Sequence, residues 1–124
     1  MRTARLTLLS VTLVAMLALA ACGDSEPFDA STLSGTHVSM DEMNFDPDAL
    51  TVKAGDDVEI ALVNDGSVKH NFSIEEADVD EDLSANDGKS FTFTAPDSPG
   101  EYKIYCDIPG HESAGMVATL IVEE

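Results

Sequence analysis

Short runs of alternating apolar and polar residues, separated by turn residues, fill this chain from Thr36 onwards and most constrain its fold. A period of two is typical of half-buried β-strands, and this region has no sustained apolar stripe with the 3.6-residue period of a helix. The pattern predicts strands at residues 36–43, 49–54, 57–63, 70–75, 89–95, 101–106 and 116–123. Between them lie turn residues such as Asp46-Pro47, Gly55-Asp56 and Asp65-Gly66. We therefore predict an all-β domain, a two-sheet Greek-key sandwich of about seven to eight strands.

One long stretch lacks this alternation. Residues 76–88 hold a cluster of acidic side chains, and few apolar residues lie among them. We expect a solvated loop here, with one helical turn around Val79 and Leu83. A calcium site requires a tighter ligand pattern than this stretch offers. A docking patch for a basic redox partner is a second interpretation of the same charges.

The N-terminus has the pattern of an export signal. Arg2 and Arg5 precede an apolar run over residues 6–19, and small residues follow. The run ends Leu-Ala-Ala-Cys22, which resembles the lipobox of bacterial and archaeal lipoproteins, where the cysteine is lipidated and becomes the first mature residue. We predict lipidation of Cys22. The alternative is a plain signal peptide cut after Ala21, which leaves a free thiol.

Three segments follow from this pattern. Residues 1–21 are the predicted signal peptide, and residues 22–35, rich in Gly, Ser, Asp and Pro, are the lipidated cysteine with a flexible tether. Residues 36–124 form the predicted domain, and a chain of 124 residues suits one domain. The expected location is extracytoplasmic, at the periplasmic or cell-surface side of the membrane to which the lipid anchors the protein.

The charge of the chain excludes some classes of partner. Lys and Arg number 6 against 24 Asp and Glu, a formal net charge of −18. Such a field repels phosphate backbones, so we expect no nucleic-acid binding and no charge-driven docking on anionic lipid. The natural partner is a cation or a basic protein. Docking of a basic partner and adaptation to a salty habitat are both compatible with this charge.

Strand parity places three side chains with soft or borderline donor atoms on inward faces, because successive residues of a strand point to opposite sides. Cys106 shares its face with Tyr102 and Ile104. His70 shares its face with Phe72 and Ile74, and Met116 shares its face with Ala118, Leu120 and Val122. His37 shares its face with Ser39 and Asp41 and is expected in solvent. Met40 and Met43 are expected to be packing or rim residues.

These three residues are joined by His111, in the connection between the last two predicted strands, and the spacing is Cys-x4-His-x4-Met. If Cys22 is lipidated, Cys106 has no partner, and a lone cysteine in an oxidising compartment indicates metal binding or reactivity. Two imidazoles, one thiolate and a weak axial thioether are the ligands of a mononuclear copper electron-transfer centre. Zinc more often recruits further thiolates or a carboxylate.

These residues carry a family resemblance. Residues 105–116, Tyr-Cys-Asp-Ile-Pro-Gly-His-Glu-Ser-Ala-Gly-Met, resemble the C-terminal ligand loop of the cupredoxins, the small type 1 blue copper proteins such as plastocyanin, halocyanin and rusticyanin. Upstream, Phe45-Asp-Pro, residues 50–55, residues 58–64 and Lys69-His-Asn-Phe72 resemble the strands that lead to the first copper histidine. The likeness spans about residues 36–124. The gap from cysteine to histidine is longer than in plastocyanin and closer to rusticyanin-like and azurin-like loops.

The resemblance implies a role for each matching residue. Cys106 would be the thiolate ligand of one type 1 copper ion, His70 and His111 the equatorial imidazoles, and Met116 the long axial ligand. Asn71 resembles the asparagine that ties the two ligand loops together, and Asp107 occupies the position that it would reach.

The implied function is electron transfer between Cu(II) and Cu(I), with no substrate transformed and no catalytic residues. The resemblance suggests electron passage at the edge of His111, near Pro109 and Gly110, and a second route at Tyr105. The expected partner is a redox protein, either a basic, cytochrome-like carrier or a membrane oxidoreductase. We expect a monomer.

Other functions can be weighed by counting ligands. Multicopper oxidases and copper nitrite reductases need further histidines, and of the 3 in the chain only His37 remains. A dinuclear copper domain needs a second thiolate beside Cys106. The main alternative is an extracytoplasmic copper-delivery or storage protein, which would use exposed Met and His clusters, with Met40 and Met43 as candidates. A sandwich with no metal and an adhesive role would require Cys106 to be inert.

Overall fold

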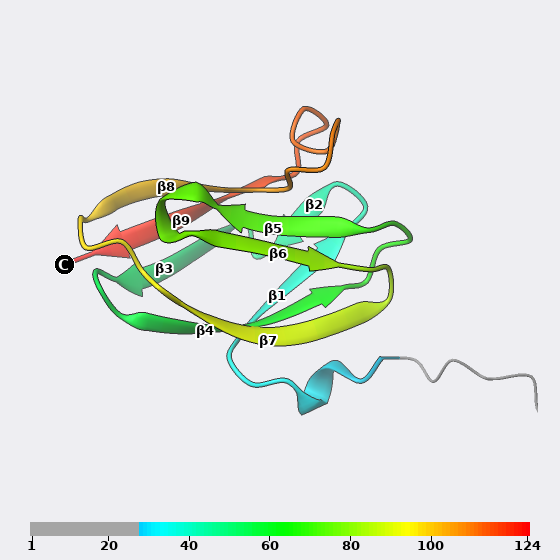
Figure 1. Cartoon of the computed structure of the whole chain (residues 1–124), viewed down its shortest axis with the longest axis horizontal. Coiled ribbons are helices and arrows are strands. Elements are labelled where there is room, and N and C mark those ends of the chain that lie inside the picture. Colours follow the sequence, from blue (N-terminus) through cyan, green and yellow to red (C-terminus); the bar gives the residue numbers. More distant parts are fainter. Residues whose placement is uncertain (1–27) are drawn as a thin grey trace, which may run out of the picture.

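The computed structural model describes residues 28–124. The predicted signal peptide and Cys22 lie outside the described residues. Within residues 28–124 no helix is long and apolar enough to cross a membrane. The described chain forms nine strands, labelled in Figure 1, and two short 3-10 helices. In chain order they are η1 (Ala30–Thr32), β1 (Thr36–Asp41), β2 (Asn44–Asp46), β3 (Ala49–Lys53), β4 (Asp57–Asn64), β5 (His70–Ile74), η2 (Glu75–Ala77), β6 (Val79–Leu83), β7 (Asp87–Thr94), β8 (Gly100–Tyr105) and β9 (Val117–Glu123).

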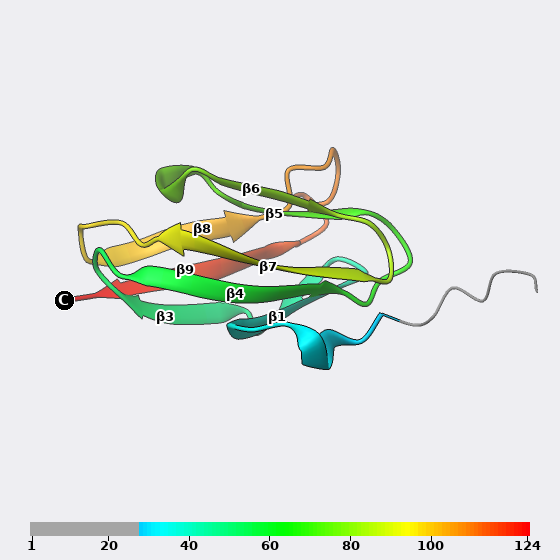
Figure 2. The ribbon, with the colours of Figure 1, turned by 60° about the horizontal axis from the view of Figure 1, so that its bottom comes forward.

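The strands form two sheets that pack face to face (Figure 2). One sheet has the order β2-β1-β4-β7, and the other has the order β3-β9-β8-β5-β6. The β1–β4 and β3–β9 pairs are parallel, and the other pairs are antiparallel. The predicted all-β sandwich is confirmed, with nine strands in the described residues in place of seven to eight.

The core lies between the sheets and is built by inward residues of alternating strands. Phe72 of β5 is fully buried and contacts Phe45 and Phe91, with ring centroids 5.7 and 5.8 Å apart. Ile60 and Leu62 of β4 and Leu120 of β9 are also fully buried. Burying an aliphatic or aromatic side chain of this size stabilises the fold by about 1.5–3 kcal/mol. This core supports the end of the sandwich at which β5 begins and β8 ends.

The prediction for residues 76–88 was wrong. In place of a loop with a helical turn around Val79 and Leu83, the chain forms η2 and then β6, which pairs with β5. Val79 and Leu83 are buried on one face of β6, and Asp80 and Asp82 point to the other. Residues four apart share a face in a strand as well as in a helix, so the apolar Val79 and Leu83 alone could not distinguish a strand from a helical turn. β2, around the buried Phe45, was also not predicted as a strand.

The last part of the predicted flexible tether, residues 28–35, lies against the sandwich (Figure 2). The Ser34 amide donates to Ser90 Oγ over 3.2 Å, and Ser90 Oγ donates back to the Ser34 carbonyl over 2.9 Å. Ser34 Oγ also donates to Glu59. Phe28 covers Gly88, where a Cβ would lie 2.2 Å from the Phe28 ring. The ordered domain therefore begins before Thr36.

Candidate metal centre

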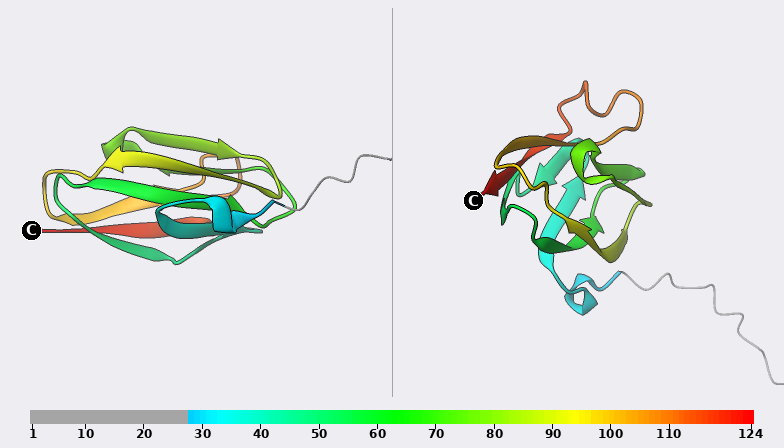
Figure 3. Two further views of the ribbon diagram at one scale, coloured as in Figure 1. Left: turned by 90° about the horizontal axis from the view of Figure 1, so that it is seen from below. Right: turned by 60° about the vertical axis from the view of Figure 1, so that its left-hand side comes forward.

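Three side chains with nitrogen or sulfur donors meet at one end of the sandwich. His70 begins β5, Cys106 follows β8, and His111 lies in the connection from β8 to β9, which projects from the sandwich (Figures 1 and 3). Their donor atoms all lie within 4.8 Å of one another. His111 Nδ1 is 3.2 Å from His70 Nδ1 and 3.4 Å from Cys106 Sγ. Metal bonds of about 2.0 and 2.3 Å to nitrogen and sulfur put donors in one plane roughly 3.5 Å apart, so the spacing suits a single ion.

Cys106 and Met116 point inward, as the alternation of apolar and polar residues predicted. Cys106 and Met116 are fully buried, as are Ile104 and Leu120 on the same inward faces. The Cys106 amide donates to the Met116 carbonyl over 3.2 Å, so these two residues prolong the β8–β9 pairing. The Cys106 thiol and the Met116 thioether thus come from paired positions, just after β8 ends and just before β9 begins.

Backbone hydrogen bonds shape the connection itself, residues 107–115, which we call the ligand loop. The His111 amide donates to the Ile108 carbonyl over 3.0 Å, and the Met116 amide donates to the His111 carbonyl over 3.1 Å. Outside the loop, Lys103 Nζ of β8 lies 2.5 Å from a Glu112 carboxylate oxygen. Hydrogen bonds within the loop and the contact of Glu112 with Lys103 thus hold the position of His111.

His70 is fully buried, and its Nε2 has no hydrogen-bond partner among residues 28–124. Burial, and then the nearby imidazole of His111, hold the pKa of His70 below its ordinary value. An uncharged imidazole offers a lone pair, as a metal ligand must. Gly66, in the loop before β5, lies close to Nε2, since a Cβ added to Gly66 would lie 3.1 Å from this atom.

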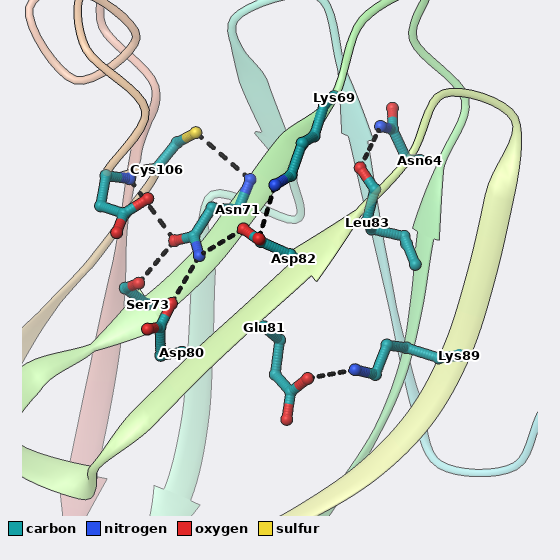
Figure 4. Close-up of polar contacts among 11 residues, drawn as sticks. Asn64, Lys69, Asn71, Ser73, Asp80, Glu81, Asp82, Leu83, Lys89 and Cys106 are labelled. Atoms are coloured by element: carbon teal, nitrogen blue, oxygen red, sulfur yellow. Dashed lines mark hydrogen bonds and ion pairs between the residues drawn. The ribbon is translucent and has the colours of Figure 1, made fainter.

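Asn71 connects the two sides of the site (Figure 4). Its backbone N–H donates to Cys106 Sγ over 3.3 Å. Its side-chain Oδ1 accepts from the Asp107 backbone amide over 3.4 Å. The contact between Asn71 and Asp107 that the resemblance implied is therefore present, through the Asp107 backbone.

The remaining histidine and the other methionines considered as ligands are not part of this cluster of donor atoms. His37 is exposed and Met40 is fully buried, as predicted, and Met43 is 36% exposed at the rim. Sequence reasoning missed Asp80 and Asp82, which bond to Asn71. The signal that could have found them is the alternation of Val-Asp-Glu-Asp-Leu in residues 79–83.

A β-sandwich that brings two imidazoles, a cysteine sulfur and a buried methionine to one end has the arrangement of a type 1 copper site, and these residue types fit one copper ion. Residues 9–122 match the model of the cupredoxin-like domain family, and the chain belongs to this family. The resemblance to the cupredoxins is thereby confirmed.

Two relatives share part of this sequence. The chain is 29% identical over 104 residues to the copper-resistant cuproprotein CopI of Rubrivivax gelatinosus, covering 68% of this chain and 63% of that protein. It is 35% identical over 89 residues to the chloroplastic plastocyanin of Tetradesmus obliquus, covering 64% of this chain and 58% of that protein. The chain thus spans less than two thirds of the length of either relative.

Solved structures agree on the fold. The reduced auracyanin of Roseiflexus castenholzii superposes with a TM-score of 0.63 at 23% identity, over 74% of this chain and 99% of that one.

Proposed function

We propose that this protein is a mononuclear type 1 copper electron carrier, tethered at the extracytoplasmic face of a membrane. The observation that supports it most is the convergence of His70, Cys106 and His111 donor atoms within 4.8 Å in a cupredoxin fold. In this proposal Met116 is the axial ligand. The names of two relatives, a plastocyanin and a cuproprotein, point the same way.

When bound, copper supplies a one-electron couple between Cu(II) and Cu(I). The protein's part is to keep the donor atoms in place in both states. Cys106, His70 and Met116 are buried in the packed end of the sandwich, and His111 is held by the bonds within the ligand loop. A close-packed interior has few alternative arrangements, so little reorganisation accompanies each transfer.

The proposed route for electrons passes the edge of His111, which is half-buried at the projecting end. Exposed apolar side chains in segments near the site in sequence are Val68, before β5, and Val117, at the start of β9. Tyr105, next to Cys106, is the second proposed route.

The absorption spectrum tests this proposal. A fragment of residues 28–124, which includes the docked segment before β1, receives one equivalent of Cu(II). We expect an intense blue thiolate-to-copper band that bleaches reversibly with reductant and is absent in Cys106→Ser. A variant Met116→Leu should keep the blue band and change the reduction potential, because the axial thioether tunes it. A colourless protein would contradict the proposal.

The second candidate is copper delivery or storage, which the name of the copper-resistant relative favours. Delivery of Cu(I) requires exposed soft ligands, and of the two candidate methionines Met43 is 36% exposed but Met40 is fully buried. Retention of copper against a chelator separates the two functions. An electron carrier should retain the ion in both redox states, whereas a delivery protein should release Cu(I) readily.

The proposed partner is a basic redox protein, a cytochrome-like carrier or a membrane oxidoreductase, and we propose that no substrate is transformed. With a net charge of −18, association with a cationic cytochrome should slow as salt screens the attraction. The proposed anchor is tested separately, by mass spectrometry of the mature N-terminus. A lipidated Cys22 would support it, and a chain cut elsewhere would contradict it.

A further inference from the structure

The side chain of Asn71 forms several hydrogen bonds beside the site. It is fully buried, and its amide uses all of its hydrogen-bonding capacity. Nδ2 donates to Asp80 Oδ1 over 2.7 Å and to Asp82 Oδ1 over 3.2 Å. Oδ1 accepts from Ser73 Oγ over 2.5 Å and from the Asp107 amide over 3.4 Å. Such a fully satisfied buried network holds a single arrangement of its members.

The two carboxylates come from β6, the strand that pairs with β5 at the sheet edge. In the register of this pair Asn71 lies opposite Asp82, and Ser73 lies opposite Asp80. Cross-strand partners share a face, so all four side chains meet on the outer side of the sheet (Figure 4). Lys69 Nζ lies 2.6 Å from Asp82 Oδ2 and holds that carboxylate from its other side.

The carboxylates determine which way the Asn71 amide points. The two ends of an amide are nearly equal in size, so their hydrogen-bond partners decide the orientation. When ionised, the carboxylates of Asp80 and Asp82 can accept hydrogen bonds but cannot donate them. They therefore attract Nδ2 of Asn71 and repel its Oδ1. Oδ1 is thereby directed to Ser73 and to the amide of Asp107, the first residue of the ligand loop.

We propose that Asp80 and Asp82 are positioning residues for the metal centre. By orienting Asn71, they fix the start of the ligand loop at Asp107 and hold the backbone N–H that reaches Cys106 Sγ. For its effect on copper the inference rests on the proposed function, since hydrogen bonding at the cysteine sulfur tunes a blue copper site. The effect on the loop does not depend on copper.

The test compares three variants of the described fragment. Asp80→Ala/Asp82→Ala removes both acceptors from the Asn71 amide. Asp80→Asn/Asp82→Asn removes both charges but keeps oxygen acceptors of nearly the same shape. The matched control is Glu81→Ala, which removes a carboxylate from the same strand, but one that bonds Lys89 and not Asn71. Circular dichroism shows whether each variant folds, and the single alanine variants replace the double variant if it does not.

The first readout is hydrogen exchange in the metal-free protein, followed by nuclear magnetic resonance. We expect the Asp107 amide and the Asn71 side-chain amide to exchange about fivefold faster in the double alanine variant, the factor for loss of roughly one net hydrogen bond. Both amides should exchange at the wild-type rate in Glu81→Ala. Equal rates in wild type and in the double alanine variant would overturn the proposal.

The second readout is the copper form. Loss of a residue that orients a ligand typically lowers metal affinity about 10- to 100-fold, so we expect copper affinity to fall by about tenfold in the double alanine variant, with a shifted thiolate band. The double asparagine variant should lose less affinity than the double alanine variant, because each new amide can still offer its oxygen to Asn71 Nδ2 but, unlike a carboxylate, can also turn its NH2 group toward it. If both double variants change alike, the carboxylates act by charge alone and the positioning role is wrong. A wild-type protein without a blue band would contradict the proposed function, while the exchange rates would still decide the role of Asp80 and Asp82.

Discussion

At the scale of single residues, close packing as well as hydrogen bonding holds the side chains of the site in place. The ring of His70 is fully buried, and its Nε2 lies close to Gly66 in the loop before β5. A Cβ built on Gly66 would lie 3.1 Å from His70 Nε2, and equally close to the Glu42 amide and to Asn64 Oδ1. Two of these neighbours are backbone or buried amide atoms that cannot easily move.

We predict that Gly66→Ala displaces the His70 ring. Overpacking of a buried position costs about 1–3 kcal/mol, and we expect the free energy of unfolding of the metal-free protein to fall by that amount. Copper affinity, measured by competition with a chelator, should fall with it. Ser67→Ala, at an exposed position of the same loop, is the control. Unchanged affinity in Gly66→Ala would show that the ring adjusts without loss.

Asn64 holds the same loop from inside. Its fully buried Nδ2 donates to the Val68 carbonyl over 2.8 Å and to the Leu83 carbonyl over 3.1 Å, and its Oδ1 accepts from the Gly66 amide. It thus joins the ends of β4 and β6 to the loop that precedes His70.

We predict that Asn64→Ala destabilises the protein by about 2–3 kcal/mol, because backbone groups are left buried without partners. Urea unfolding followed by circular dichroism measures this change. Asn44→Ala in β2, where the side chain is exposed, should cost much less. Similar losses in the two variants would contradict the assigned role of Asn64.

At the scale of elements, β6 shows what the sequence could and could not predict. Strands with a clear apolar face, such as β4, β5 and β9, were predicted within a few residues. β6 was not, because acidic residues are rare in strands and its stability depends on partners elsewhere in the chain. Lys69 and Lys89 lie beside its carboxylates, and Asn71 donates to two of them. Pairings of this kind are tertiary and leave no local pattern.

The same bonds give β6 a pH dependence. The ammonium of Lys69, and then the amide of Asn71, hold the pKa of Asp82 below its ordinary value of 3.8. A lowered folded-state pKa stabilises the protein above the unfolded-state value, and this stabilisation is lost as the pH falls through the folded-state value.

We therefore predict that acid removes the advantage of wild type over Asp82→Asn. The difference between their free energies of unfolding should be constant above about pH 5 and should shrink as the pH falls below 3.8. Urea unfolding over this pH range measures it. A difference that persists at the lowest pH would show that the carboxylate charge is not responsible.

At the scale of the whole molecule, the negative charges of Asp and Glu far outnumber the positive charges of Lys and Arg. The described residues contain ion pairs between Lys69 and Asp82, Lys89 and Glu81, and Lys103 and Glu112, all on partly or largely exposed side chains. Exposed pairs contribute little, about 0–1 kcal/mol each. A net charge of −18 therefore leaves a repulsion across the surface that these pairs do not cancel.

We predict that added salt stabilises this fold. Raising KCl from about 0.01 M to about 1 M shortens the screening length from roughly 30 to 3 Å and removes most of the repulsion. The melting temperature of the metal-free fragment should rise by several degrees. A falling melting temperature would mean that the ion pairs outweigh the repulsion.

The fold class and the inward donors could be predicted because both follow from a period of two along single strands. The order of strands in each sheet could not be predicted, since the pairing of β1 with β4 and of β3 with β9 depends on contacts distant in sequence. The docking of residues 28–35 was missed for the same reason, because Ser34 bonds to Ser90 across 56 positions.

The parallel pairing of β1 with β4 has a mechanical consequence. β1 runs from Thr36 to the end of the sandwich at which the donor atoms meet, and its residues from Thr36 to Met40 pair in register with Ile60 to Asn64. A pull on the N-terminus, against a partner held at that end, loads these hydrogen bonds along the strand axis. The bonds must then stretch together in shear and cannot open one after another, so the first strand of this domain is suited to bear tension.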